Sequence, residues 1–141
     1  MDERSNWMPC SFEFARKVGM VEGNPFSAMI QNPGEGPLAY NVPLPTVRRG
    51  NRLTLSGVAL GIYKAEPGSN VTRIQIRGIT HNNNDELWVD ATPYSGSRKV
   101  EQNFSAIDCS AYDAIKVVVY VDHKGQTPLQ IAFVNVKYQY V

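Results

Sequence analysis

The feature that most constrains this chain is an alternation of apolar and polar residues with a period of two. Leu53 and Leu55 alternate with polar residues, and Val117, Val119 and Val121 repeat the same spacing later in the chain. Successive side chains of a β-strand point to opposite faces, so this spacing is typical of strands with one buried face. No segment shows the 3.6-residue period of an amphipathic helix. The sequence therefore predicts an all-β protein.

Turn sequences rich in Gly, Pro, Asn and Asp separate the predicted strands. They lie at residues 66–69, 81–85, 93–97 and 122–125. With one strand near Phe12 and another at 38–44, the chain holds about eight strands, as two-sheet sandwiches do. We expect a two-sheet antiparallel β-sandwich, and the jelly roll is the topology that we favour. An immunoglobulin-like sandwich and a closed barrel stay open as alternatives, because one sequence does not set the order of the connections.

The predicted strand at 53–62 changes phase at Gly57. Leu53 and Leu55 occupy one set of alternate positions, whereas Val58 and Leu60 occupy the other set. One extra residue in a paired strand shifts the faces in this way, so the pattern predicts a β-bulge at Gly57. The two halves would then form one long, bent strand with a single buried face.

The first 50 residues differ in composition from the rest of the chain. They contain six of the nine prolines and five of the eleven glycines. We expect residues 1–50 to form an extended N-terminal arm with short strands, and residues 51–141 to form the core of one domain. The residues predicted to contact a neighbouring subunit come from this arm and from the outward face of the strand at 115–121: Trp7, Phe12, Phe14, Phe26, Val118 and Tyr120.

Charge and hydropathy exclude several partners. The net charge of +1 and the absence of a nucleic-acid-binding motif predict no nucleic acid partner. No apolar run approaches the length of a membrane-spanning helix, so we expect no membrane partner. The N-terminus also lacks the basic and apolar regions of a signal peptide. The compartment stays undetermined, and a virion is one setting compatible with the sequence.

The residues that perform most enzyme chemistry are few. His81 and His123 fall in predicted turns and belong to no metal-binding or nucleophile motif, so we expect both to be solvent-exposed. Cys10 and Cys109 are far apart in sequence and predict two buried free thiols. A calcium site or a pair of catalytic carboxylates would need acids that converge, which their spacing does not indicate. We therefore expect no enzyme activity, no cofactor and no bound metal.

Trp88 stands out in the predicted strand at 87–91. If Leu87 and Val89 face the core, Trp88 shares the opposite face with acidic residues, where an exposed indole ring is unusual. An aromatic ring flanked by hydrogen-bonding groups suits the face of a sugar. The predicted saccharide site consists of Trp88, Tyr94, Asn83, Asn84, Glu86 and Asp90. The alternative is that Trp88 packs under the N-terminal arm or against another subunit.

Two functions follow from these surfaces. The first is a non-catalytic structural protein, a β-sandwich subunit that joins other subunits in a homo-oligomer or larger assembly, as capsid, decoration or tail components of viral (phage) particles do. The alternative is a carbohydrate-binding module with Trp88 and Tyr94 as its aromatic platform. An enzyme on the same fold would require Asp122 and His123 to meet a further carboxylate in one pocket.

Overall fold

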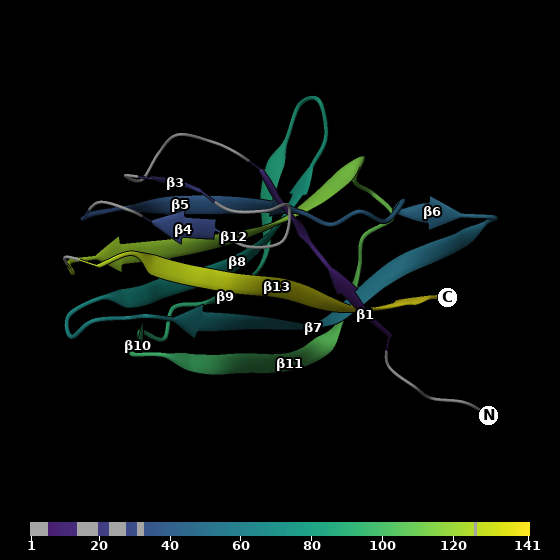
Figure 1. The fold of residues 1–141 in the computed structure, drawn as a ribbon. Helices are drawn as coiled ribbons and strands as arrows, with labels where there is room; N and C mark the ends of the chain where they lie inside the picture. The colour runs from purple at the N-terminus through teal and green to yellow at the C-terminus, as the bar shows by residue number, and fades with distance from the viewer. Residues whose placement is uncertain (1–5, 14–19, 23–27, 31–32, 126) are drawn as a thin grey trace.

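A computed structural model describes residues 6–13, 20–22, 28–30, 33–125 and 127–141. Within these ranges the secondary structure consists of strands, and two antiparallel sheets pack face to face (Figure 1). The predicted all-β sandwich is therefore confirmed. Across the same residues no helix is long and apolar enough to cross a membrane.

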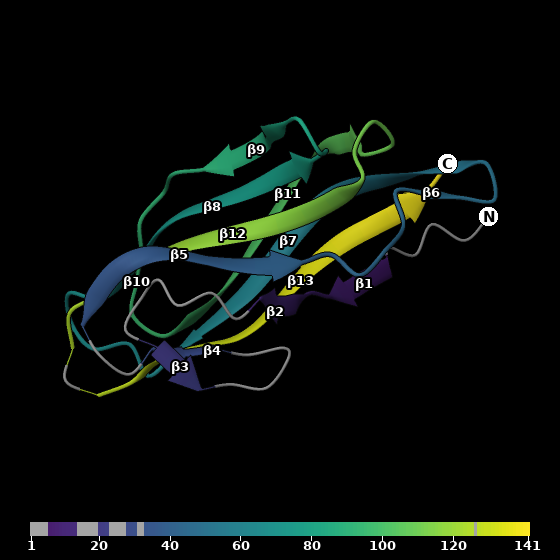
Figure 2. The same cartoon turned by 90° about the horizontal axis from the view of Figure 1, so that it is seen from above.

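Each sheet combines strands from distant parts of the sequence. Sheet A contains β1 (Asn6–Pro9), β3 (Met20–Glu22), β4 (Ala28–Ile30), β6 (Val47–Arg48), β7 (Asn51–Tyr63), β11 (Arg98–Asp108) and β13 (Leu129–Tyr140). Sheet B contains β2 (Ser11–Glu13), β5 (Gly34–Asn41), β8 (Asn70–Ile79), β9 (Asn84–Asp90), β10 (Tyr94–Ser95) and β12 (Ala114–His123). Figure 2 shows the long strands of the two sheets running in similar directions, as in aligned sandwich packing. The jelly-roll order of connections stays a prediction.

The order of the strands places long central strands between shorter ones. Sheet A runs β11-β7-β13-β4-β3, with β1 also paired with β13, and sheet B runs β10-β8-β12-β5-β2, with β9 also paired with β8. The first 50 residues supply strands to both sheets, because β1 pairs with β13 and β2 with β5. In its described parts, the predicted arm is thus built into the sandwich of its own chain.

Phe12 corrects one of the interface predictions. Its side chain is buried in the core of its own chain, with its ring centroid 5.3 Å from that of Tyr40. The pairing of Phe12 with Tyr40 across β2 and β5 places both rings on the inward face, so Phe12 is not available to a neighbouring subunit. Phe14 and Phe26, predicted to have the same role, lie outside the described residues.

The change of phase in β7 is confirmed at the predicted place. Leu55 lies opposite Tyr138 of β13 and Gly57 lies opposite Lys137, which makes Ser56 the extra residue of a bulge. Leu53, Leu55, Val58, Leu60 and Ile62 are all buried in consequence. One bent strand therefore contributes a continuous apolar row to the core.

Tyr40 carries one of the two buried side-chain polar atoms without a hydrogen-bond partner among the described residues; the other is Nε2 of His123. Its hydroxyl forms no hydrogen bond among the described residues, although the side chain is fully buried. Burial, with a smaller effect of Cys10, raises the pKa of Tyr40 far above the usual tyrosine value, so the hydroxyl stays protonated. A buried hydroxyl without a partner opposes folding by the cost of removing it from water.

We expect the substitution Tyr40→Phe to leave the free energy of unfolding unchanged or to raise it by about 1 kcal/mol, because it removes only the unpaired hydroxyl. Tyr94→Phe is the matched control. The Tyr94 hydroxyl donates a hydrogen bond to Asp90 and accepts one from Gln102, so its removal is expected to cost about 1–2 kcal/mol. Urea denaturation of both variants measures the difference, and a larger loss for Tyr40→Phe would contradict it.

Candidate functional site

The histidines and cysteines do not form a reactive cluster. His81 is exposed as predicted, but the prediction for His123 is wrong, because its ring is buried at the end of β12, with Nδ1 3.1 Å from the Ser69 hydroxyl. Cys10 and Cys109 are both buried and free, as predicted. Burial raises the pKa of each thiol to about 12, which keeps both protonated and unreactive at neutral pH.

The acids considered for catalysis or metal binding are engaged separately. Asp122 pairs with Lys124 at 3.4 Å, and Asp108 pairs with Arg52 at 2.7 Å in the other sheet. Over the described ranges, no three His, Cys, Asp or Glu side chains lie in a group that could hold a metal ion. These residues give no starting point for an acid-base or metal mechanism.

The predicted facing of Trp88 is wrong. Trp88 lies opposite Ile76 of β8, which is fully buried, whereas Val89 lies opposite Gln75 and is 41% exposed. The register between β8 and β9 shifts beside Leu87, and this bulge reverses the faces that simple alternation assigns. Trp88 is half-buried and packs against the core rather than standing among acids in solvent.

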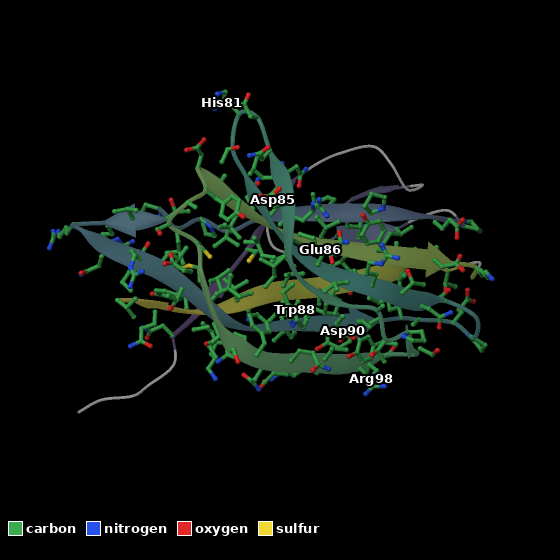
Figure 3. The ribbon with its side chains drawn as sticks, turned by 180° about the vertical axis from the view of Figure 1, so that it is seen from behind. His81, Asp85, Glu86, Trp88, Asp90 and Arg98 are labelled. Carbon is green, nitrogen blue, oxygen red and sulfur yellow. The ribbon has the colours of Figure 1, made fainter. Side chains whose placement is uncertain are left out.

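Trp88 and its neighbours close one side of the sandwich. The indole stacks on Phe104 of β11, with ring centroids 4.6 Å apart and planes 29° apart, which joins sheet B to sheet A. The Tyr94 hydroxyl bonds Asp90 and accepts a hydrogen bond of 2.7 Å from Gln102 of β11. We call these five residues the seam. Figure 3 shows Trp88 and Asp90 on β9 beside β11, with His81 at the tip of the preceding loop.

Asp90 is held in its charged form within the seam. Partial burial raises the pKa of Asp90, but hydrogen bonds from Tyr94 and Thr92 outweigh it, so the pKa lies below its ordinary value. A carboxyl whose pKa is lowered by folding stabilises the folded state above its unfolded pKa. This contribution is lost as the pH falls through the lowered pKa of Asp90.

The other predicted saccharide residues lie on the opposite face of β9 or in the loop before it. Glu86 accepts a hydrogen bond of 2.6 Å from Gln75, and Asn84 accepts one from Arg77. Asn83 lies in the exposed loop, where its backbone N–H donates a hydrogen bond to the Thr80 hydroxyl. The six predicted residues are therefore divided between two faces of sheet B and do not converge on one ligand.

The outward face of sheet B carries the two remaining predicted contact residues of β12. Val118 is only 8% exposed, so it offers little surface to a neighbouring subunit. The Tyr120 ring is half-buried, with the Arg73 guanidinium 5.4 Å from its centroid. Both residues are thus partly or largely buried within this chain.

The outward face of sheet A contains a hollow that the sequence did not predict. Three cross-strand rows build it from β11, β7 and β13: Lys99, Gly61 and Phe133, then Glu101, Ala59 and Asn135, then Asn103, Gly57 and Lys137. Trp7 of β1 lies opposite Lys137 and closes the third row. Large or polar side chains therefore flank a central strand that has almost no side chains on this face.

The small residues of β7 are required by their neighbours. A Cβ atom at Gly61 would lie 2.6 Å from Cε1 of Phe133, closer than real Cβ atoms approach, so the ring lies flat on the glycine backbone. A Cβ at Gly57 would be 3.1 Å from both Lys137 Cβ and Asn103 Oδ1. Ala59 lies between these covered glycines and forms the floor of the hollow, where it is only 4% exposed.

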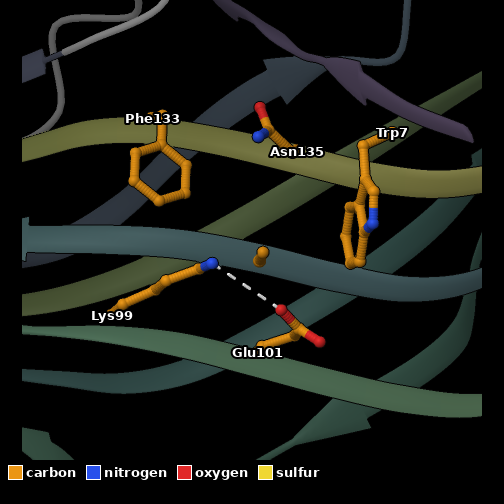
Figure 4. A pocket seen from close by; sticks show the side chains of 6 residues that line it. Trp7, Lys99, Glu101, Phe133 and Asn135 are labelled. Atoms are coloured by element: carbon orange, nitrogen blue, oxygen red, sulfur yellow. Dashed lines mark ion pairs between the residues drawn. The ribbon is translucent and has the colours of Figure 1, made fainter.

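The resulting Ala59 groove has a volume of about 330 Å³ and is lined by Trp7, Ala59, Lys99, Glu101, Phe133 and Asn135. Figure 4 shows the Phe133 and Trp7 rings near its two ends and the ion pair of Lys99 and Glu101 along one side. Trp7 was predicted as a subunit contact, whereas the sequence assigned no role to Phe133. The alternate small residues of β7 are the sequence signal that points to the groove.

Comparisons with known proteins give distant likenesses to solved structures only. No protein-family model matches the chain, and no curated protein matches it significantly. Among similar solved structures is the family 32 CBM from C. perfringens NanJ in complex with galactose. The alignment covers 96% of this chain and 93% of that chain, with 17% sequence identity and a TM-score of 0.48. The function of this chain must therefore be argued from its own surface.

Proposed function

We propose that this protein is a non-catalytic carbohydrate-binding protein, and that the Ala59 groove is its binding site. The observation that carries the proposal is the pair of aromatic rings, Trp7 and Phe133, that line a groove whose floor is the small residue Ala59. A pyranose has an apolar C–H face that stacks on aromatic rings and a rim of hydroxyl groups that needs polar partners. The groove supplies both, and its volume falls in the range of small-molecule sites, about 300–1,000 Å³.

The polar residues of the groove support binding rather than hydrolysis. Glycoside hydrolases use two carboxylates placed on either side of the bond to be cleaved, about 5–10 Å apart. Of the six residues that line the groove, Glu101 alone has a carboxylate, and Lys99 lies 3.8 Å from it. The groove therefore lacks the second acid or base that this chemistry requires.

The assembly function predicted from the N-terminal segment has weaker support. Its discriminating feature was an arm that buries aromatic residues in a neighbour, yet β1 and β2 pair with β13 and β5 of the same chain. Trp7, the described arm residue with an accessible ring, lines the Ala59 groove. A saccharide accounts for this ring without a second subunit.

Saccharide binding is expected to depend on the two groove rings. The ligands are soluble linear hexasaccharides of glucose, galactose, mannose and xylose, measured by calorimetry. At least one should bind, and Trp7→Ala and Phe133→Ala should each lower its affinity about tenfold or more, because each removes a stacking surface. In the Trp88→Phe background Trp7 is the only tryptophan, so binding should also change its fluorescence.

The control is Tyr120→Ala, which removes a half-buried ring from the outward face of the other sheet. This variant should keep the affinity of the wild-type protein, and circular dichroism should show that all variants fold. Failure of all four hexasaccharides, and of their uronic acid counterparts, to bind would overturn the proposed function. Loss of binding in Tyr120→Ala but not in Trp7→Ala would move the site to sheet B.

A further inference from the structure

We infer that the Ala59 groove selects uncharged sugars with two adjacent free hydroxyl groups and excludes the corresponding uronic acids. This inference rests on the proposed carbohydrate function and specifies its ligand class. It depends on the arrangement of Lys99 and Glu101, which line the groove together with Asn135.

Lys99 and Glu101 form an exposed ion pair on one strand. They occupy alternate positions of β11 and lie opposite Gly61 and Ala59, so both project onto the groove side of sheet A. Lys99 Nζ is 3.8 Å from Glu101 Oε1, and the side chains are 64% and 45% exposed. A direct charge-assisted hydrogen bond is shorter, about 2.7–2.9 Å, so neither group is fully satisfied by the other.

The two charges have complementary hydrogen-bonding abilities. The ammonium group of Lys99 only donates hydrogen bonds, and the ionised carboxylate of Glu101 only accepts them. A hydroxyl group does both, so one sugar hydroxyl accepts from Lys99 while its neighbour donates to Glu101. The amide of Asn135, on the other side of Ala59, is able to donate to or accept from the rim of the same ring. Two adjacent hydroxyls therefore satisfy both charges at once.

A uronic acid disturbs this balance. The groove lining carries one positive and one negative side chain, so its formal charge is zero. The carboxylate of a uronic acid would bring a second negative group beside Glu101, and both would compete for the single cation Lys99. Acylation of either adjacent hydroxyl has a related effect, because it removes a donor to Glu101 or crowds Lys99.

Lys137 is the other cation on this face. It does not line the groove: its Nζ donates a hydrogen bond of 3.1 Å to Asn103 Oδ1 and lies 6.0 Å from the centroid of the Trp7 ring. Its positive charge is thus held in the row beyond Ala59. If acidic sugars were to bind, Lys137 is the residue that would attract them.

The test compares each neutral hexasaccharide with a uronic acid counterpart at one ionic strength. The pairs are glucose with glucuronic acid, galactose with galacturonic acid, mannose with mannuronic acid, and xylose with glucuronic acid, which carries a carboxylate on the C5 of xylose. The neutral member of the pair that binds should bind at least about tenfold more tightly. Glu101→Gln should lower the affinity for the neutral sugar about threefold to tenfold. It should also lower the ratio of the affinity for the neutral sugar to the affinity for the uronic acid. Lys99→Gln should lower the affinity for the neutral sugar without raising the affinity for the uronic acid.

The matched control is Glu35→Gln, which removes an exposed carboxylate from β5 of the other sheet and should change neither affinity. Equal or tighter binding of a uronic acid would overturn the inference but leave the proposed function intact, and Lys137→Gln would then identify the cation responsible. An unchanged ratio in Glu101→Gln would overturn it as well. If neither neutral nor acidic hexasaccharides bind, both the inference and the proposed function are overturned.

Discussion

Trp88→Ala is expected to lower the free energy of unfolding by about 2–4 kcal/mol, because the indole joins the two sheets. Its ring stacks on Phe104 across the sandwich and packs against the core. Truncation of a fully buried tryptophan costs about 3–5 kcal/mol, and the lower value here reflects a half-buried ring. Urea denaturation followed by circular dichroism measures the change.

The neighbouring substitution Val89→Ala is the control, because the sequence pattern and the structure disagree on which of the two substitutions destabilises the fold more. Alternation in the sequence places Val89 in the core and Trp88 outside, whereas Val89 is 41% exposed in the structure. We expect Val89→Ala to change stability by about 0.5 kcal/mol or less. If Val89→Ala were the more damaging variant, the bulge beside Leu87 would be misplaced.

The seam also supports the Ala59 groove. The strand β11 directs Gln102 and Phe104 inward to the seam, and directs Lys99 and Glu101 outward to the groove. Because the two faces of a strand share one backbone, contacts that fix the register of β11 also fix the positions of the groove charges. A variant that loosens the seam is therefore expected to weaken saccharide binding indirectly.

The local pattern was sufficient to predict the fold class and one bulge. Strict alternation identified β8 and β12, and the phase change at Gly57 was visible because strong apolar residues flank it on both sides. The sequence pattern did not reveal two other bulges. One lies beside Leu87 in β9, and the other lies at Ala132 of β13, which the register with β7 skips. In these segments the side chains on both faces are apolar or aromatic, so alternation gives no clear phase.

The candidate site was beyond the reach of sequence reasoning because it depends on long-range pairing. Trp7 reaches the groove through pairing of β1 with β13, and Glu101 reaches it through pairing of β11 with β7. Neither pairing leaves a local signal, and strand order is set by the whole sheet. The same reason explains the incorrect grouping of Glu86 with Trp88, which the register places on opposite faces.

Gly78→Val is expected to lower the free energy of unfolding by about 3 kcal/mol, although valine favours strands more than glycine does. A Cβ atom at Gly78 would lie 2.5 Å from Cδ1 and Cγ of Tyr112, an approach that the ring cannot accept without moving. Hydrogen bonds hold both the ring and the backbone of Tyr112, because its hydroxyl donates to Asp85 and its backbone carbonyl accepts from the Thr46 hydroxyl. Overpacking at such a site forces the backbone or the anchored ring to shift.

A double-mutant cycle with Tyr112→Ala separates this clash from other effects of valine. In the Tyr112→Ala background the ring is absent, so Gly78→Val should cost less than about 1 kcal/mol. The coupling energy measured by urea denaturation should then be about 2 kcal/mol. Equal costs in both backgrounds would show that strand β8 rejects valine for a reason other than Tyr112. A large coupling would show that Gly78 is needed because the Tyr112 ring lies directly on its backbone, as the Phe133 ring does on Gly61.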